Sequence, residues 1–319
     1  MQDATKPKGI AKIWRELKRP FKQFIRYKQS KLSGMSVKQD AGDNPFLSEL
    51  YVRSDGRVNI DNIEIDIVLG CNLRCYHCTH FSPYRKGYIP TETIIHWFET
   101  WSKKIHPNTI KVLGGEPFLH PELSTVLYET RRIWNDVRLI IVSNGLLIPQ
   151  APQSSFDALR EAKFHVIVSD HSSTDFPYEK IVSKCEENEI SYELRPSNQH
   201  WWVQHQWNEH CDPIPFQSPP YDAWLACYSK YCPSLANNLL YKCPALASII
   251  EGVNEGSLSP QHWKDVLTHG ALSSDADADT ILKYFRTREV RECYVCPSKV
   301  IITEPRQISH LSRIDKNIT

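Results

Sequence analysis

The chain has 319 residues, enough for one large α/β domain with a smaller appendage or for two ordinary domains. Its hydrophobic fraction of 41% and charged fraction of 24% exclude a disordered chain and a bundle of membrane helices. A net charge of +1 gives no global reason to expect nucleic acid as a partner. Because no stretch is long and apolar enough to span a bilayer, and the N-terminus lacks the apolar core of a signal peptide, we expect a cytoplasmic protein.

The N-terminal region is distinguished by its basic charge. Residues 1–40 hold 11 Lys and Arg against 3 Asp and Glu, and apolar residues recur among them at helical spacing. A basic amphipathic helix over residues 8–31 can lie on an anionic membrane surface or dock a partner, whereas capping of the next domain and partial disorder are equally open. Because Gly and Pro recur over 33–58, we assign residues 1–58 to an N-terminal arm and linker.

Strand-like apolar runs alternate with amphipathic helical patterns in the middle of the chain. This alternation predicts an α/β fold with a parallel sheet and right-handed crossovers. Functional residues should gather where the carboxyl ends of the parallel strands meet at one edge of the sheet. The predicted strands span 62–69, 109–113, 137–142, 164–169 and 190–195, and the predicted helices span 91–104, 121–134, 152–162 and 177–188.

The alternation of strands and helices ends at about residue 198. A segment rich in Trp and His follows over 200–211, and its histidine spacing matches no common metal site, so we interpret it as a loop over the mouth of the fold. Four prolines over 212–220 indicate a domain boundary near residue 215. We therefore expect one domain over 59–215, a small cysteine-bearing domain over 216–305 and a tail over 306–319.

Ten cysteines in a chain without a secretion signal favour metal ligands or redox thiols over disulfides. Three of them, Cys71, Cys75 and Cys78, form a C-x3-C-x2-C array directly after the first predicted strand. Three thiolates on one short loop can hold three corners of a [4Fe–4S] cubane and leave the fourth iron open for a substrate. A zinc site is the alternative, although zinc sites more often pair one C-x2-C with another or with histidines.

This array and its position resemble the signature of the radical S-adenosylmethionine (SAM) superfamily. His77 stands before the third cysteine, where an aromatic residue is usual in that family. The second predicted strand runs into Gly-Gly-Glu-Pro at 114–117, which resembles the GGE motif of the same family. The resemblance implies a partial (β/α)6 barrel, a [4Fe–4S] cluster, SAM, and an electron donor such as flavodoxin or ferredoxin.

The ends of the predicted strands carry the residues that the resemblance assigns to SAM. Glycines allow close approach of the backbone, and the Glu116 carboxylate can accept hydrogen bonds from the SAM ammonium. The later strand ends are implied to contact the ribose and carboxylate of SAM, although turn capping would explain the same residues. The SAM-binding candidates are Gly114, Gly115, Glu116, Ser143, Asn144, Ser169 and Arg195.

A second group of cysteines lies in the C-terminal region. Cys227 and Cys243 flank Asn238, which stands where glycine is usual in the auxiliary-cluster domains of radical SAM enzymes, and Cys293-x2-Cys296 follows. Asn tolerates the left-handed turn that a hairpin would need there. By resemblance, these four thiolates hold a second [4Fe–4S] cluster. No cysteine follows Cys296, so the region looks like the shortened, SPASM-like form called a twitch domain.

Three cysteines remain outside these two groups. Cys185 lies in a polar helical pattern and is interpreted as inert. The spacing does not decide whether Cys211 or Cys232 replaces Cys227 as a ligand of the second cluster. If Cys232 is free beside the active site, it can instead donate a hydrogen atom to a substrate radical.

The leading functional hypothesis, again by resemblance, is an oxidoreductase that cleaves SAM to a 5′-deoxyadenosyl radical. The radical would remove a hydrogen from a carbinol of a sugar or aminocyclitol-like substrate. An epimerase with Cys232 as hydrogen donor is the alternative. A peptide maturase is less favoured, because residues 1–58 are too short for the additional peptide-binding domain that such enzymes usually carry. The non-enzymatic alternative is a metal-binding scaffold, against which the Gly-Gly-Glu motif argues.

Overall fold

The computed structural model describes residues 45–171, 176–196, 201–210, 212–303 and 308. The chain divides into two units, residues 1–48 and residues 49–319. In the first unit the description is limited to the short helix α2 (Pro45–Ser48), so the amphipathic helix expected over 8–31 lies outside the described residues. Among the helices that the structure describes, none is long and apolar enough to cross a membrane.

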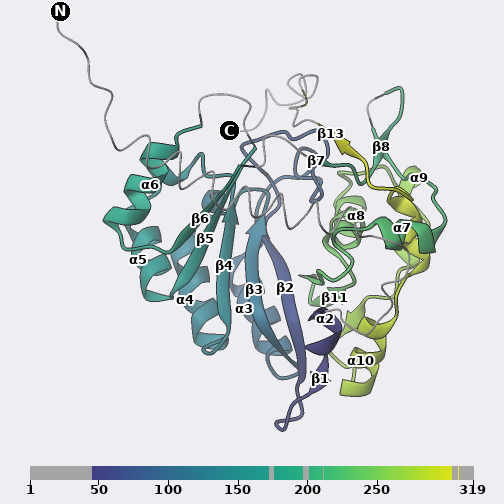
Figure 1. The fold of residues 1–319 in the computed structure, drawn as a ribbon, viewed down its shortest axis with the longest axis horizontal. Coiled ribbons are helices and arrows are strands. Elements are labelled where there is room, and N and C mark those ends of the chain that lie inside the picture. The colour runs from purple at the N-terminus through teal and green to yellow at the C-terminus, as the bar shows by residue number, and fades with distance from the viewer. Residues whose placement is uncertain (1–44, 172–175, 197–200, 211, 304–307, 309–319) are drawn as a thin grey trace, which may run out of the picture. The chain divides into compact units, whose positions relative to one another are not determined.

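The second unit is organised around a largely parallel sheet (Figure 1). Its strands follow the order β12-β11-β10-β2-β3-β4-β5-β6, with β1 paired to β2, and the six from β10 to β6 are mutually parallel. This mixed α/β architecture confirms the predicted fold class. The central strands are β1 (Tyr51–Val52), β2 (Val58–Val68), β3 (Ile105–Gly114), β4 (Arg138–Ser143), β5 (Phe164–Asp170) and β6 (Tyr192–Pro196).

The crossover helices cover one face of this sheet. Helices α3, α4 and α5 lie behind the strands in the view of Figure 1. On β2 the fully buried Ile63, Ile65 and Ile67 alternate with partly exposed Asn62, Glu64 and Asp66, so the apolar and polar sets lie on opposite faces of the sheet. The crossover helices are α3 (Thr91–Trp101), α4 (Leu123–Ile133), α5 (Gln153–Glu161) and α6 (Tyr178–Glu187), with short η1 (Pro117–Leu119) and η2 (Ile148–Gln150).

The first two central strands begin earlier than the sequence predicts. β2 starts at Val58 and β3 at Ile105, and the register pairs Val58 with Ile105 and Ile60 with Pro107. A proline ordinarily disfavours a strand interior, so a strand that includes Pro107 is not expected from the sequence alone. Burial of Val58, Ile60 and Ile105 explains why the strands nevertheless extend through this region.

The C-terminal region continues the same sheet. β10 (Ser234–Ala236) pairs in parallel with β2, through Ser234 opposite Glu64, and antiparallel with β11 (Leu239–Tyr241), which pairs with β12 (Leu272–Ser273). The domain boundary expected near residue 215 therefore does not coincide with a break in the sheet, and it stays a prediction. The region also contains α7 (Pro220–Ala226), α8 (Pro244–Asn254), α9 (Pro260–Trp263), η3 (Val266–Thr268), α10 (Ala278–Arg286) and η4 (Arg291–Val295).

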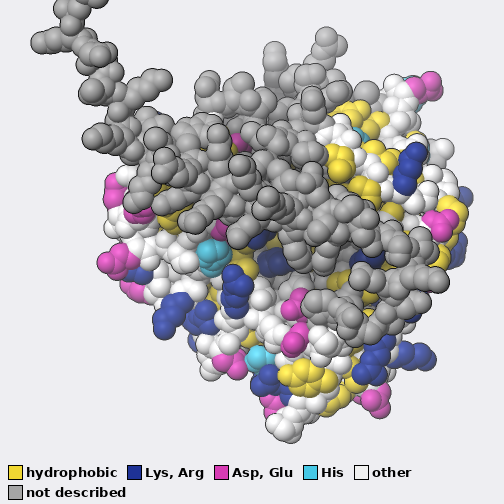
Figure 2. Space-filling model, in the orientation of Figure 1, with side chains coloured by type: hydrophobic (Ala, Val, Ile, Leu, Met, Phe, Trp, Pro, Cys, Tyr) yellow, Lys and Arg dark blue, Asp and Glu magenta, His cyan; other side chains and the backbone are white. Residues whose placement is uncertain are grey.

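The hairpin between β10 and β11 closes through two asparagines. Asn237 has φ +50° and Asn238 φ +57°, so both occupy the left-handed region that a two-residue type I′ turn requires. This agrees with the turn expected from Asn238 in place of glycine. Figure 2 shows charges of both signs interspersed over the described surface on this face, in line with the net charge of +1.

Candidate functional site

The first cysteine loop begins where β2 ends. Leu69 and Gly70 donate backbone hydrogen bonds to the Gly87 carbonyl, and these bonds fold the chain back over the strand end. Cys75 is buried, whereas Cys71 and Cys78 are half-buried. The loop therefore lies at the carboxyl edge of the parallel sheet, where the sequence predicts the functional residues.

The two glycines after β3 pack directly against this loop. A Cβ on Gly114, whose φ is +140°, would lie 2.2 Å from the Val68 carbonyl oxygen, and a Cβ on Gly115 would lie 1.7 Å from the Gly70 oxygen. The backbone N–H of Gly115 donates to Val68, and that of Glu116 donates to Gly70. Side chains are excluded here because the end of β2 occupies the space.

Glu116 is fully buried and ties the loop after β3 to the end of β4. Its carboxylate accepts hydrogen bonds from Ser143 Oγ at 2.8 Å, from the Asn144 backbone N–H at 2.8 Å and from the Phe118 N–H at 3.1 Å. Burial raises the pKa of Glu116 to about 7, against the effect of these donors. The Glu116 oxygens are thus bonded within the protein, and the expected contact of this carboxylate with the SAM ammonium stays a prediction.

Asn144 connects β4 to the first cysteine loop. Its Nδ2 donates to Asn72 Oδ1 at 2.7 Å and lies 3.6 Å from Cys71 Sγ. The Leu73 backbone N–H also donates to the same sulfur at 3.4 Å. Three neighbouring strand ends thus converge on the cysteine loop, as a preorganised ligand site requires.

The thiols of this loop have the surroundings of metal ligands. Burial and the neighbouring Cys78 raise the pKa of Cys71 to about 12, against the effect of the Leu73 N–H. Burial also raises the pKa of Cys78, whereas N–H groups of Ser82 and His80 lower it. These donors would stabilise thiolates, so the residues fit a [4Fe–4S] cluster, whose assembly must displace the thiol protons.

No three His, Cys, Asp or Glu side chains among the described residues are grouped as they would be around a single metal ion. The ligands of a cubane bind separate iron atoms, so their sulfurs lie further apart than ligands of one ion.

Two further strand ends carry predicted SAM contacts. Ser169 is half-buried on β5, and Arg195 on β6 is exposed and pairs with Glu193 at 2.8 Å. Next to Ser169 and Asp170, His171 is half-buried, and desolvation of its ring lowers its pKa to about 4, with a further lowering effect from His80. The structure therefore places Ser169 and Arg195 on the same sheet edge but shows no bond from either to the cysteine loop among the described contacts.

A polar array covers the inner face of β2 and β3. Lys111 Nζ lies 2.9 Å from Glu64 Oε1, 3.3 Å from Asn62 Oδ1 and 3.5 Å from Cys232 Sγ. Burial raises the pKa of the Cys232 thiol well above its ordinary value, and Glu64 adds to the effect. Cys232 thus lies on the face of the sheet opposite the crossover helices.

Asp66 continues the polar side of β2 toward the carboxyl end of the strand. Its Oδ2 lies 2.9 Å from His80 Nδ1. Burial alone would lower the pKa of His80, but the Asp66 charge outweighs burial and raises it. The alternation of Asn62, Glu64 and Asp66 was visible in the sequence as polar residues at every second position of an apolar strand.

Four cysteines of the C-terminal region form a second group. Cys243 immediately precedes α8, Cys293 lies in η4, and Cys296 directly follows η4. Burial raises the pKa of Cys296 well above its ordinary value, and Cys227, Cys243 and Cys293 raise it further. These are the four ligands expected from the sequence. Cys232 lies apart from them beside Lys111, and Cys211 lies outside the described residues.

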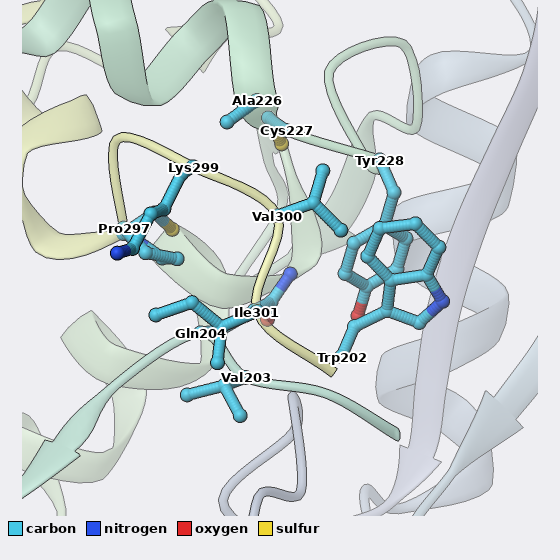
Figure 3. A pocket seen from close by; sticks show the side chains of 11 residues that line it. Trp202, Val203, Gln204, Ala226, Cys227, Tyr228, Pro297, Lys299, Val300 and Ile301 are labelled. Atoms are coloured by element: carbon cyan, nitrogen blue, oxygen red, sulfur yellow. The ribbon is translucent and has the colours of Figure 1, made fainter. Parts of the chain in front are cut away.

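A small pocket adjoins this second group (Figure 3). Its volume of about 20 Å³ leaves room for about one water molecule. Cys227 and Cys296 line it together with Trp202 and Tyr228, whose ring centroids are 4.9 Å apart.

One hydrogen bond joins the segments that carry the two thiol groups. The Tyr228 hydroxyl lies 3.0 Å from Thr79 Oγ1. Tyr228 directly follows Cys227, and Thr79 directly follows Cys78. The residues next to Cys78 and Cys227 thus connect the two cysteine groups directly.

The Trp- and His-rich segment contains short strands, whereas the sequence predicts a loop. It contains β7 (Trp201–Trp202), paired with β13 (Ile302–Thr303), and β8 (Gln206–Trp207), paired with β9 (Pro213–Ile214). We call residues 201–207 the aromatic strap. Trp207 of the strap stacks on Tyr76 inside the first cysteine loop, with ring centroids 4.5 Å apart.

Sequence reasoning missed a buried ion-pair network that joins the two halves of the second unit. The guanidinium of Arg85 is fully buried and lies 2.9 Å from Glu251 and 2.8 Å from Glu255, both from the segment of α8. Burial raises the pKa of Glu251 to about 7, while Arg85 opposes the rise. The partners are separated by more than 160 positions, and no local pattern signals such a pairing.

Comparison with known proteins finds a family match in the central region of the chain. Residues 65–190 match the model of the Radical SAM superfamily. This part of the chain is therefore similar to a superfamily whose members hold a [4Fe–4S] cluster and bind SAM.

Curated relatives are similar over a limited stretch. The GTP 3′,8-cyclase of Clostridium acetobutylicum is 34% identical over 97 residues, which cover 29% of this chain and 30% of the relative. That of a Sulfurovum species is 26% identical over 114 residues, or 34% of each chain. The chain thus matches about a third of the length of these relatives.

Solved structures show similarity at low sequence identity. BtrN in complex with AdoMet and 2-DOIA has a TM-score of 0.43 and 14% identity, over 76% of this chain and 98% of that chain. The peptide-bound anSMEcpe structure has a TM-score of 0.33 and 18% identity, over 42% of each chain.

Proposed function

We propose that the chain is a radical SAM enzyme that removes a hydrogen atom from its substrate. Cys71, Cys75 and Cys78 would hold the first [4Fe–4S] cluster. When bound, this group supplies the electron that cleaves SAM to the 5′-deoxyadenosyl radical. The supporting observation is the convergence of the β3 and β4 ends on the cysteine loop through the Gly115 and Glu116 backbone and the Asn144 side chain.

The residues around the loop would position SAM in different ways. Gly114 and Gly115 would line its methionyl end, because they place bare backbone beside the loop. Glu116 would act as a positioning residue, since its carboxylate holds the ends of β3 and β4 together. Ser169 and Arg195 remain candidates for the ribose and carboxylate of SAM.

We infer a second [4Fe–4S] cluster in a twitch-like C-terminal region. Cys227, Cys243, Cys293 and Cys296 would supply four thiolates, which fully ligate a cubane and leave no open iron. Backbone N–H groups at the start of α8 donate to Cys243 Sγ and would stabilise its thiolate. Such a closed cluster suits an electron acceptor better than a substrate site.

The reaction that this arrangement would support is oxidation of a carbinol in a sugar or aminocyclitol-like substrate. The hydrogen atom would go to the 5′-deoxyadenosyl radical, the electron to the second cluster and the proton to solvent, which together converts the carbinol to a ketone. The polar array of Asn62, Glu64 and Lys111 on the inner face offers hydrogen-bond donors and acceptors of the kind that hydroxyl and amino groups need.

Epimerisation is a second candidate, and the placement of Cys232 favours it. The Cys232 thiol lies in the polar array, and its raised pKa keeps the S–H hydrogen in place at neutral pH. In Cys232→Ala, a dehydrogenase should keep forming ketone, while an epimerase should stop inverting its substrate. Solvent deuterium in a product of unchanged oxidation state, lost in Cys232→Ala, would contradict dehydrogenation.

SAM cleavage tests the proposed activity without knowledge of the substrate. The anaerobically loaded protein, reduced with dithionite, should release 5′-deoxyadenosine from SAM, and the Cys71→Ala variant should not. Chromatography with mass detection measures the product. Absence of 5′-deoxyadenosine from protein with a fully loaded first cluster would contradict the proposal.

A further inference from the structure

The aromatic strap packs against the part of the first cysteine loop that lies between Cys75 and Cys78. Trp207 stacks on Tyr76 at an interplanar angle of 22°. The His205 ring lies 5.3 Å from that of His77 and 4.8 Å from that of Phe81, measured between centroids. The strap therefore covers one side of the loop with aromatic rings.

Three nitrogen atoms of the strap are buried without a hydrogen-bond partner among the described residues. They are Nδ1 and Nε2 of His205 and the indole Nε1 of Trp207. The indole N–H can only donate. Burial lowers the pKa of His205 to about 3, so its ring is neutral at neutral pH and has one N–H donor and one acceptor.

Unpaired buried donors of this kind point to a missing acceptor. Leaving a buried N–H unpaired costs about 1–3 kcal/mol, and the strap carries this cost at two neighbouring side chains, His205 and Trp207. The rings around them, Tyr76, His77 and Phe81, belong to the first cysteine loop. A group held by this loop can supply the missing acceptor.

If the loop holds a [4Fe–4S] cluster, the sulfur atoms of the cluster and of its cysteine ligands are such acceptors. Three thiolates make the loaded site anionic, and one-electron reduction adds a further negative charge. An N–H donor stabilises the more negative state, and the effect is stronger in a buried site. We propose that Trp207 and His205 donate hydrogen bonds to sulfur atoms of the first cluster and so raise its reduction potential, an inference that rests on the proposed function.

Redox titration of substitution variants tests this inference. Trp207→Phe keeps a ring to stack on Tyr76 but loses the N–H, and His205→Phe removes both imidazole nitrogens. Trp202→Phe is the matched control, because Trp202 lies on the same strap but packs on Tyr228. Electron paramagnetic resonance follows the reduced first cluster, which is identified by the change in its signal on addition of SAM.

The expected result is a more negative midpoint potential in Trp207→Phe and His205→Phe, with Trp202→Phe equal to the parent. A tenfold smaller equilibrium constant for reduction corresponds to about 59 mV for a one-electron couple. Unchanged potentials in both variants at the iron content of the parent would overturn the inference.

A second measurement on the unsubstituted protein covers the case in which the variants fail to load iron. In protein labelled with 15N at the indole nitrogen of tryptophan, pulsed resonance spectroscopy should detect indole 15N couplings to the reduced first cluster. Their absence would overturn the inference, and so would a retained coupling of the same size in Trp207→Phe. A parent protein with no SAM-sensitive cluster signal would instead contradict the proposed function itself.

Discussion

At the residue scale, the Gly-Gly-Glu motif acts first on the protein's own backbone. Gly115 has no room for a side chain, because its Cβ position lies 1.7 Å from the Gly70 carbonyl oxygen. The motif thereby joins the end of β3 to the start of the first cysteine loop. The sequence predicted the motif and its place, but not that the glycines pack on the loop.

Substitution of Gly115 should therefore destabilise the folded protein even when no ligand is bound. We expect Gly115→Ala to lower the free energy of unfolding by more than about 3 kcal/mol, because the added carbon overlaps backbone that cannot move aside. Gly270→Ala is the matched control, since no atom lies within 4 Å of the added Cβ. Urea unfolding of the cluster-free protein measures both. Equal stability of the two variants would show that the contact is not tight in solution.

The buried carboxyl of Glu116 should make the stability of the cluster-free protein depend on pH. Its pKa is about 7 in the folded protein, against a usual value of 4.5 in the unfolded chain. Between these pH values the folded state holds the extra proton, so stability is highest below pH 4.5 and falls as the pH rises through 7. The shift corresponds to about 3 kcal/mol for this fully buried group.

The variant Glu116→Gln isolates this effect, because the amide does not titrate. The free energy of unfolding of the parent, relative to that of Glu116→Gln, should fall by about 3 kcal/mol between pH 4.5 and pH 7. Urea unfolding across this window measures the difference. A constant difference would mean that the carboxyl is hydrated or already charged in the folded protein.

At the element scale, the sequence predicted the central strands and crossover helices because their signals are local. Apolar alternation and helical periodicity recur within ten or so residues, and the observed α3, α4, α5 and α6 lie within the predicted ranges. The pairing of β10 with β2 was not predicted. It joins segments that are far apart in sequence, and three residues such as Ser234–Ala236 carry too short a pattern to reveal a partner.

The two-residue turn between β10 and β11 is a test at this scale. Asn238 has φ +57°, which Gly tolerates freely and a β-branched residue does not. We expect Asn238→Val to destabilise the protein by roughly 1–2 kcal/mol, and Asn238→Gly to be neutral or stabilising. Urea unfolding of both variants checks the order. A Val variant as stable as the Gly variant would show that this turn is not left-handed in solution.

At the scale of the whole molecule, the sequence predicted which cysteines group together, but not how the groups are connected. The spacing of Cys227, Cys243, Cys293 and Cys296 pointed to one ligand set, and the structure brings these four thiols together. The hydrogen bond between Tyr228 and Thr79 depends on tertiary packing, as does the ion pair of Arg85 with Glu251. Such contacts have no periodic signature in the sequence, so they require the structure.

The central claim is that each cysteine group holds its own cluster, and iron and sulfide analysis tests it most directly. The anaerobically reconstituted protein should contain about eight iron and about eight sulfide per chain, as two [4Fe–4S] clusters require. The variant with Cys71→Ala, Cys75→Ala and Cys78→Ala should keep about four of each on the second group. A parent that never exceeds about four iron, or a triple variant that loses all of its iron, would contradict the account.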